Sequence, residues 1–348
     1  MRQRCLVGRY TKTQGITAYQ FDQGVMTKEW DSCPVMNPSY LYEKDDRIYA
    51  VLETQEYEGQ HGGGAAAFQV EPDGLRLINT QPVLGVDPCH LLTSLDGKIL
   101  LTANYTEGSF SCFPLDENGA IGPIVYQQFH HGKGIDPVRQ EKPHIHFLAH
   151  TPDRKYICVV DLGCDAMVGY EAVTPWQSPW FKEVFRVSFI PGTGPRHMVF
   201  SPNGAFAYVV GELGNTVTVC RYLGEQGMEP IQVISTLDSS FTGESTCAAI
   251  KISADGKNLY VSNRGADTVT GYAVDEKTGK LSCIQHISVG GKTPRDLSLD
   301  ITEKYLCTAN QDSDSITVFE REKDGMLRMI RQYDNIEKPV CLLFQKVL

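Results

Sequence analysis

The feature that most limits the possible folds is a hairpin pattern that recurs along the whole chain. Each copy reads as a strand, a turn that usually contains Asp or Asn, and a second strand rich in β-branched and aromatic residues. The clearest copy begins at Pro195, turns at Pro202-Asn203-Gly204 and ends near Leu213. Six copies, 47 to 57 residues apart, begin near Pro38, Pro88, Ile145, Pro195, Cys247 and Pro294.

Further strand-like sequence follows the hairpins, for example at 216–220 and 315–319. Four strands in a unit of about 50 residues are typical of a β-propeller blade. The chain ends supply a seventh unit: residues 339–344 read as its innermost strand, and residues 4–10, 15–21 and the segment around Trp30 as the other three. We therefore predict an all-β, seven-bladed propeller of four-stranded antiparallel blades. It forms a single domain over residues 1–348, closed by pairing of the terminal strands, which removes two exposed sheet edges.

The composition excludes several classes of function. A hydrophobic content of 41% and a charged content of 21% are ordinary for a soluble globular protein. The net charge of −10 argues against a nucleic-acid partner. No leader resembles a signal peptide, and no window approaches the ~20 apolar residues of a membrane span, so we expect no membrane association.

Cysteine usage favours a reducing compartment. The eleven cysteines are odd in number, none forms a Cys-x-x-Cys motif, and many lie in apolar strands, so free buried thiols and a cytoplasmic location are expected. Cys89-His90 and His144-x-His146 lack the paired spacing of a zinc motif. We predict no metal and no cofactor.

Charged side chains recur at the same ends of the hairpins. Because hairpin strands are antiparallel, the start of an innermost strand and the end of the next strand meet at one mouth of the central channel. The candidate catalytic residues at this mouth are His146, Arg196, Glu212 and Arg264. The candidate substrate-binding residues there are Arg295, His90, Asn104, Asn263 and Asn310.

Such a set suits an anionic substrate, since guanidinium groups bind carboxylate or phosphate and stabilise an oxyanion, while a histidine or carboxylate moves a proton. Taken singly, each residue also has a structural explanation: Arg196 and Glu212 as an ion pair, Arg264 in a solvated turn, His146 in the core. The convergence of four ionisable residues favours a site.

Two further expectations concern neighbouring segments. Strand alternation turns His197 away from the face used by Arg196, so His197 is expected to pack, as are His144 and His150. The segment 130–142 reads as a long loop at the same mouth, and loops of this length are often functional.

Longer motifs carry a family resemblance. They are Gly194-Pro195-Arg196-His197 with Gly211-Glu212-Leu213, Pro143-His144-Ile145-His146 with Val160-Asp161-Leu162-Gly163, and Val261-Ser262-Asn263-Arg264-Gly265. These motifs resemble the seven-bladed-propeller lactonases of the 6-phosphogluconolactonase type, which are related to the fungal enzyme that lactonises carboxymuconate. The resemblance covers essentially the whole chain, although residues 35–37 and 89–90 stand where the family commonly has small polar residues.

The resemblance implies a metal-independent enzyme of the pentose phosphate pathway that hydrolyses 6-phosphoglucono-1,5-lactone to 6-phosphogluconate. In the cycloisomerase branch the proposed active-site residues would correspond to His146, Glu212, Arg196 and Arg264. Our hypothesis is that water adds to the lactone carbonyl of a small anionic lactone. Glu212 or His146 acts as the base, and the arginines, assisted by Arg295, stabilise the oxyanion or hold the phosphate.

Two alternatives remain open. A cycloisomerase acting on a carboxymuconate-like dicarboxylate would use the same residues in the ring-forming direction. A non-catalytic scaffold would instead favour aromatic and apolar side chains around the mouth. The sequence carries no signal for an oligomeric state.

Overall fold

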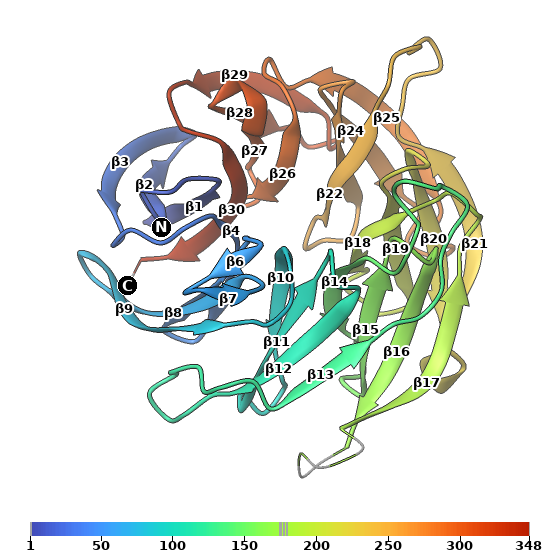
Figure 1. The fold of residues 1–348 in the computed structure, drawn as a ribbon. Helices are drawn as coiled ribbons and strands as arrows, with labels where there is room; N and C mark the ends of the chain where they lie inside the picture. The colour runs from blue at the N-terminus through green and yellow to red at the C-terminus, as the bar shows by residue number, and fades with distance from the viewer. Residues whose placement is uncertain (1, 174–175, 177, 179, 348) are drawn as a thin grey trace.

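Seven sheets surround a central channel (Figure 1). The structure is a computed structural model that describes residues 2–173, 176, 178 and 180–347, so the two end residues of the predicted unit 1–348 lie outside it. Within the described residues, each of the seven sheets has four antiparallel strands. The predicted all-β, seven-bladed propeller is confirmed.

We name each blade after its innermost strand, and the strands follow from the channel outward. The first three blades are β4 (Pro38–Lys44), β5 (Arg47–Leu52), β8 (Gly64–Glu71), β9 (Gly74–Pro82); β10 (Pro88–Thr93), β11 (Ile99–Asn104), β12 (Ser109–Pro114), β13 (Tyr126–Phe129); and β14 (Ile145–His150), β15 (Tyr156–Asp161), β16 (Ala166–Ala172), β17 (Phe181–Ser188). The next three are β18 (Pro195–Phe200), β19 (Phe206–Gly211), β20 (Thr216–Tyr222), β21 (Met228–Ser235); β22 (Thr246–Ile252), β23 (Asn258–Arg264), β24 (Thr268–Val274), β25 (Leu281–Ser288); and β26 (Pro294–Leu299), β27 (Tyr305–Asn310), β28 (Ser315–Arg321), β29 (Leu327–Tyr333).

The seventh blade joins the two ends of the chain. It consists of β30 (Pro339–Lys346), β1 (Gln3–Arg9), β2 (Thr17–Asp22) and β3 (Val25–Asp31). Strand β30 pairs antiparallel with β1, from Gln3 opposite Lys346 to Arg9 opposite Pro339. The predicted closure is therefore observed.

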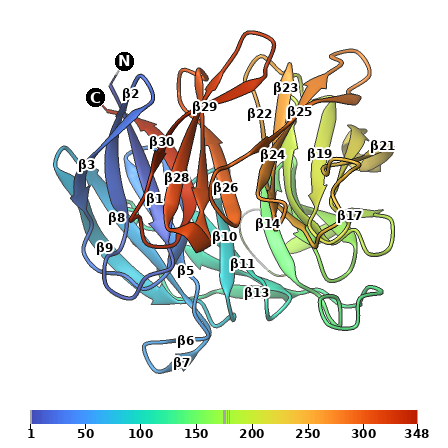
Figure 2. The ribbon, with the colours of Figure 1, turned by 90° about the horizontal axis from the view of Figure 1, so that it is seen from above.

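In the part of the chain that the structure describes, two short strands and two 3₁₀ turns lie outside the four-stranded sheets. A hairpin of β6 (Glu56–Tyr57) and β7 (Gln60–His61), which the sequence pattern did not predict, extends β5 beyond the mouth-side end of its blade. In Figure 2 this hairpin projects from the same face as the loop after β13. The 3₁₀ turns η1 (Gly224–Gln226) and η2 (Gln311–Ser313) lie between strands. Among the described residues, no helix has the length and apolar character needed to cross a membrane.

The tight turns away from the mouth are set by local hydrogen bonds. Ser201 Oγ donates to Asn203 Oδ1 (2.7 Å) and accepts from the Phe206 amide (2.9 Å). Gly204 supplies the positive φ (+72°) that the turn requires. The equivalent turn of the β22 blade repeats the pattern with Ser253. These bonds fix the hairpin register, and with it the residues that reach the opposite, mouth-side end.

The apolar core lies between neighbouring blades. Val210 and Val219 of the β18 blade, for example, belong to one buried cluster with Ile250 and Val261 of the β22 blade. Because each blade packs its faces on the next, the ring holds the mouth residues of different blades at fixed separations.

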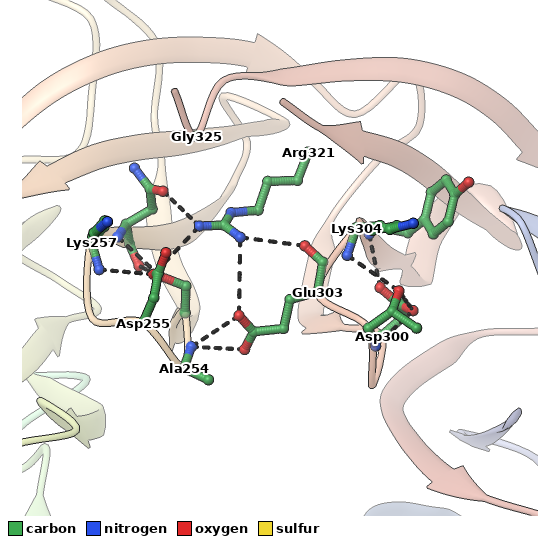
Figure 3. Close-up of polar contacts among 12 residues, drawn as sticks. Ala254, Asp255, Lys257, Asp300, Glu303, Lys304, Arg321 and Gly325 are labelled. Carbon is green, nitrogen blue, oxygen red and sulfur yellow. Dashed lines mark hydrogen bonds and ion pairs between the residues drawn. The ribbon is translucent and has the colours of Figure 1, made fainter. Parts of the chain in front are cut away.

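A polar cluster also joins two blades at the end away from the mouth (Figure 3). Arg321 at the end of β28 donates to the Tyr260 hydroxyl (3.0 Å) and lies near the carboxylates of Asp255 (3.6 Å) and Glu303 (4.0 Å). Glu303 in turn accepts the Ala254 amide of the neighbouring blade (2.7 Å). This cluster ties the β26 blade to the β22 blade.

Candidate active site

Every innermost strand begins with a register shift. In β18, Pro195 pairs with Gly211 and His197 with Val210, so Arg196 has no partner residue. A bulge of this kind re-aims a side chain. The same shift leaves unpaired Ser39, Cys89, His146, Arg295 and Val340, and in β22 both Ala248 and Ala249.

The bulge overturns one expectation from strand alternation. His197 does not turn away from Arg196, because the bulge brings both side chains toward the channel. His197 Nε2 lies 3.2 Å from Arg196 Nη1, and its ring meets that of His146 edge-on with centroids 5.2 Å apart. The interior of the channel is therefore more polar than simple alternation predicts.

Three of the unpaired residues, Cys89, His146 and Arg295, line a cavity of about 360 Å³ at the mouth, together with residues at or just beyond the ends of second strands. Its walls are Glu53, Asp87, Cys89, Tyr105, Thr106, Arg139, His146, Glu212, Arg264 and Arg295. His146, Arg196 and Arg295 also line a small void of about 10 Å³ in the channel. The structure thus brings together the four predicted catalytic residues and Arg295.

Glu212, directly after β19, is the centre of the charge network. Its Oε2 lies 2.9 Å from Arg196 Nε and 2.7 Å from Arg264 Nη2, while Oε1 accepts from Arg139 Nη2 at 2.5 Å. Burial alone would raise the pKa of Glu212, but the arginines hold it well below its usual range. Glu212 is therefore an ionised anchor for three guanidinium groups.

Two of these guanidinium groups are also bound to backbone. Arg196 Nη1 donates to the Ala248 carbonyl (2.7 Å), and Arg264 Nη2 donates to the Cys247 carbonyl (2.8 Å). Burial and the neighbouring charge of Arg264 lower the pKa of Arg196 to about 10. Both side chains are thus held in one place, and Arg196 carries a charge that its surroundings only partly neutralise.

His146 lies buried beside this network. Its Nδ1 atom is buried and has no hydrogen-bond partner in the protein. Burial and the charge of Arg196 lower the pKa of His146 well below its ordinary value, although Glu212 opposes the shift. The imidazole is therefore neutral at pH 7 and has a lone pair available to accept a proton.

Arg295 completes the cationic wall. Its guanidinium carbon lies 5.2 Å from the centre of the Tyr10 ring, and Nη2 lies 3.7 Å from Glu53 Oε1. Tyr10 donates to the same carboxylate oxygen at 2.8 Å. Burial opposes the charge of Arg295, yet Tyr10 and Glu53 raise its pKa above the ordinary value, so Arg295 remains protonated.

His90 is not brought to the cavity. Its ring packs between those of Tyr40 (centroids 4.3 Å apart) and Phe147 (4.0 Å), and its Nδ1 accepts from the Leu148 amide (3.3 Å). The bulge at Cys89 is the reason, because Cys89 takes the cavity-lining position and His90 the next one. The prediction that His90 stands at the mouth was wrong.

The three asparagines predicted to bind substrate are buried inside their blades. Asn310 Nδ2 donates to the hydroxyls of Ser315 (3.2 Å) and Thr317 (3.0 Å) on the third strand. Asn104 and Asn263 make the same pair of bonds in their own blades. All three amides are fully buried and none lines the cavity. The geometry gives them a structural role in joining second strands to third strands.

Arg139 was missed as an individual residue. It belongs to the long loop 130–142, which the sequence analysis did place at this mouth. No repeat contains an equivalent position, so the repeat pattern gave no reason to single it out. Among the residues that the structure describes, no group of three or more His, Cys, Asp or Glu is arranged to hold a metal ion.

The propeller thus has a buried histidine, three carboxylates and four arginines at its channel mouth, and comparison with known proteins identifies the class to which it belongs. The family described as "Lactonase, 7-bladed beta-propeller" matches residues 4–344. The chain belongs to this lactonase family.

Individual relatives are similar over their whole length. The chain is 34% identical over 347 residues to a 6-phosphogluconolactonase of Bacillus subtilis, with 97% of each protein covered. It superposes with a TM-score of 0.91 and 30% identity on a periplasmic gluconolactonase of Pseudomonas aeruginosa, covering 100% of both chains. A Lactobacillus plantarum protein gives the same TM-score at 31% identity, with 99% of this chain and 100% of that chain covered.

Proposed function

We propose that this lactonase-family protein hydrolyses 6-phosphoglucono-1,5-lactone to 6-phosphogluconate in the pentose phosphate pathway. The observation that carries the proposal is the neutral, buried imidazole of His146 beside a cluster of arginines in a cavity of about 360 Å³. The Bacillus relative supports a phosphorylated substrate, whereas the Pseudomonas relative makes the unphosphorylated lactone the direct competitor. Eleven free cysteines, eight of them buried, support a cytoplasmic location.

The charges favour His146 over Glu212 as the general base. Three arginines occupy both oxygens of Glu212 and lower its pKa, so its carboxylate is a poor proton acceptor. His146 is neutral and its Nδ1 is free of protein partners. We assign the base to His146 and the positioning of the arginines to Glu212.

The reaction then proceeds by general-base catalysis. His146 takes a proton from water while the water oxygen bonds to the lactone carbonyl carbon, and negative charge develops on the carbonyl oxygen. Arg196 and Arg295, which line the same void as His146, stabilise that oxyanion. The bond from the carbonyl carbon to the ring oxygen breaks as protonated His146 returns the proton to the ring oxygen. The product carries a new hydroxyl and a carboxylic acid, which releases its proton to water and becomes a carboxylate.

The test is hydrolysis of freshly generated 6-phosphogluconolactone at slightly acidic pH, where spontaneous ring opening is slow, with and without a chelator. Gluconolactone serves as the matched unphosphorylated substrate. We expect chelator-resistant acceleration that is greater for the phosphorylated lactone. Failure to accelerate either lactone would contradict the proposal and direct the search to carboxymuconate. Faster turnover of gluconolactone would replace the substrate while keeping the reaction.

A further inference from the structure

Arg139 differs from the other arginines that contact Glu212 in its exposure. The Arg196 side chain is 3% exposed and that of Arg264 is 15% exposed, whereas Arg139 is 39% exposed. Arg196 and Arg264 are also bound to backbone carbonyls, while the other hydrogen bond of Arg139 goes to the Tyr105 hydroxyl (3.1 Å). Arg139 is thus the cation of this group that can change partners at least cost.

The backbone that carries Arg139 is firmly held. Asp136 Oδ1 accepts the amides of Val138 and Arg139, both at 2.9 Å. The buried Gln140 side chain accepts the amide of Asp136 (3.2 Å) and donates to the Leu162 carbonyl (2.9 Å). A change of partner at Arg139 therefore needs rotation of the side chain and no rearrangement of the loop.

The base of the loop is fixed as well. His130 Nδ1 lies 2.8 Å from Asp161 Oδ2, and the other oxygen of Asp161 accepts the His144 amide (2.9 Å). Asp161 therefore holds His130, where the loop begins, and His144, just after the loop ends. The position from which the Arg139 side chain reaches into the cavity is set before any ligand arrives.

The charges around the cavity still favour an anionic ligand. Four guanidinium groups, those of Arg139, Arg196, Arg264 and Arg295, stand against the carboxylates of Glu53, Asp87 and Glu212. Three of the guanidinium groups share Glu212, whose Oε2 still contacts Arg196 and Arg264 if Arg139 leaves. A phosphate dianion offers Arg139 more charge than the shared carboxylate does. Tyr105 accepts from Arg139 and so keeps its own hydrogen to donate, and burial raises its pKa, which keeps that hydrogen in place.

We propose that Arg139, with the Tyr105 hydroxyl, binds the phosphate at the end of the substrate remote from the reacting carbonyl, exchanging Glu212 for that phosphate. The inference rests on the proposed function and deepens it. Arg139 is then the residue that sets the preference for a phosphorylated lactone over an unphosphorylated one, while His146, Arg196 and Arg295 act on the carbonyl.

The experiment compares Arg139→Gln with Lys133→Gln, which removes one positive charge from an exposed position of the same loop. In R139Q we expect the KM for 6-phosphogluconolactone to rise by about 10- to 150-fold, the effect of losing hydrogen bonds to a charged group. The kcat for this lactone and the kcat/KM for gluconolactone should stay within about threefold. K133Q should leave both substrates within about twofold.

A binding measurement separates failure of this inference from failure of the proposed function. Calorimetry with 6-phosphogluconate, gluconate and inorganic phosphate needs no turnover. We expect wild type to bind 6-phosphogluconate most tightly and R139Q to lose that preference. Equal losses for both lactones, a fall in kcat at constant KM, or unchanged 6-phosphogluconate affinity in R139Q would each overturn the assignment. Wild-type protein that hydrolyses neither lactone would refute the proposed function. The calorimetry would still test whether Arg139 binds the phosphate group.

Discussion

Removal of the Glu212 carboxylate is the perturbation whose cost the structure defines best. Glu212→Ala leaves Arg139, Arg196 and Arg264 without the carboxylate that lies 2.5 to 2.9 Å from each of them. Removing one partner of a buried ion pair costs about 3–5 kcal/mol, because the other charge stays buried and uncompensated. We expect the free energy of unfolding at pH 7 to fall by this amount, a large part of the ~5–15 kcal/mol typical of a folded protein.

The assay is chemical denaturation of wild type and variant in acetate and in chloride at equal ionic strength. Acetate carries the missing carboxylate and fits the space that Ala leaves, so it should restore stability to E212A where chloride does not. At ten times its dissociation constant a bound anion contributes about 1.4 kcal/mol. Glu229→Ala, which breaks an exposed pair with Arg221, is the control and should cost less than ~1 kcal/mol with no acetate effect.

The stability difference between wild type and E212A should change with pH in a definite direction. The pKa of Glu212 is lower in the folded protein than in the unfolded chain, where it is about 4.3. Its contribution is therefore fully present above that value and is lost as the pH falls toward the folded pKa. The gap between wild type and E212A should narrow below about pH 4. A variant as stable as wild type at pH 7, or a gap that widens in acid, would refute the reasoning.

Three further substitutions probe separate parts of the structure. His146→Gln should lower kcat about 10²- to 10⁴-fold with little change in KM. In the wild type, kcat/KM should fall with decreasing pH only below the ordinary histidine pKa of about 6.5, and this fall should be absent in the variant. Asn310→Ala removes two buried hydrogen bonds to the hydroxyls of Ser315 and Thr317, although these hydroxyls keep their contacts with Ser313 and the Val289 carbonyl. The free energy of unfolding should therefore fall by about 1–3 kcal/mol while kcat/KM is kept, and a selective rise in KM would restore Asn310 to the substrate site. Arg321→Met should lower the denaturation midpoint by removing two contacts between blades, the hydrogen bond to Tyr260 and the ion pair with Asp255, of which Figure 3 draws the second. A change in KM would show that these contacts affect the site.

The repeat pattern predicted the fold closely because the same hairpin occurs in every blade. Innermost strands begin at Pro38, Pro88 and Pro195 as expected, and β22 begins at Thr246, one residue before the expected Cys247. The turn residues fix each hairpin register by hydrogen bonds within a few positions of sequence. Such local chemistry can be read without knowing the rest of the structure.

The bulges could not be read in the same way. Nothing local distinguishes Arg196 as the unpaired residue and His197 as the paired one, since the shift depends on how the whole strand meets β19. The error at His90 has the same origin. The role of Arg139 was not predicted for a different reason. Its contact with Glu212 joins positions 73 residues apart, and Arg139 lies in a loop that has no counterpart in the other blades.

The bulges also explain how a repeated blade produces a site that is not symmetric. Of the unpaired positions, His146, Arg196 and Arg295 carry long polar side chains, and the others are small or apolar, such as Ala248. The backbone at a small position is still part of the site, because Arg196 reaches across to the next blade and donates to the Ala248 carbonyl. The chemistry of the mouth therefore depends on which bulge positions carry charged side chains and on the backbone of the neighbouring blade that holds them in place.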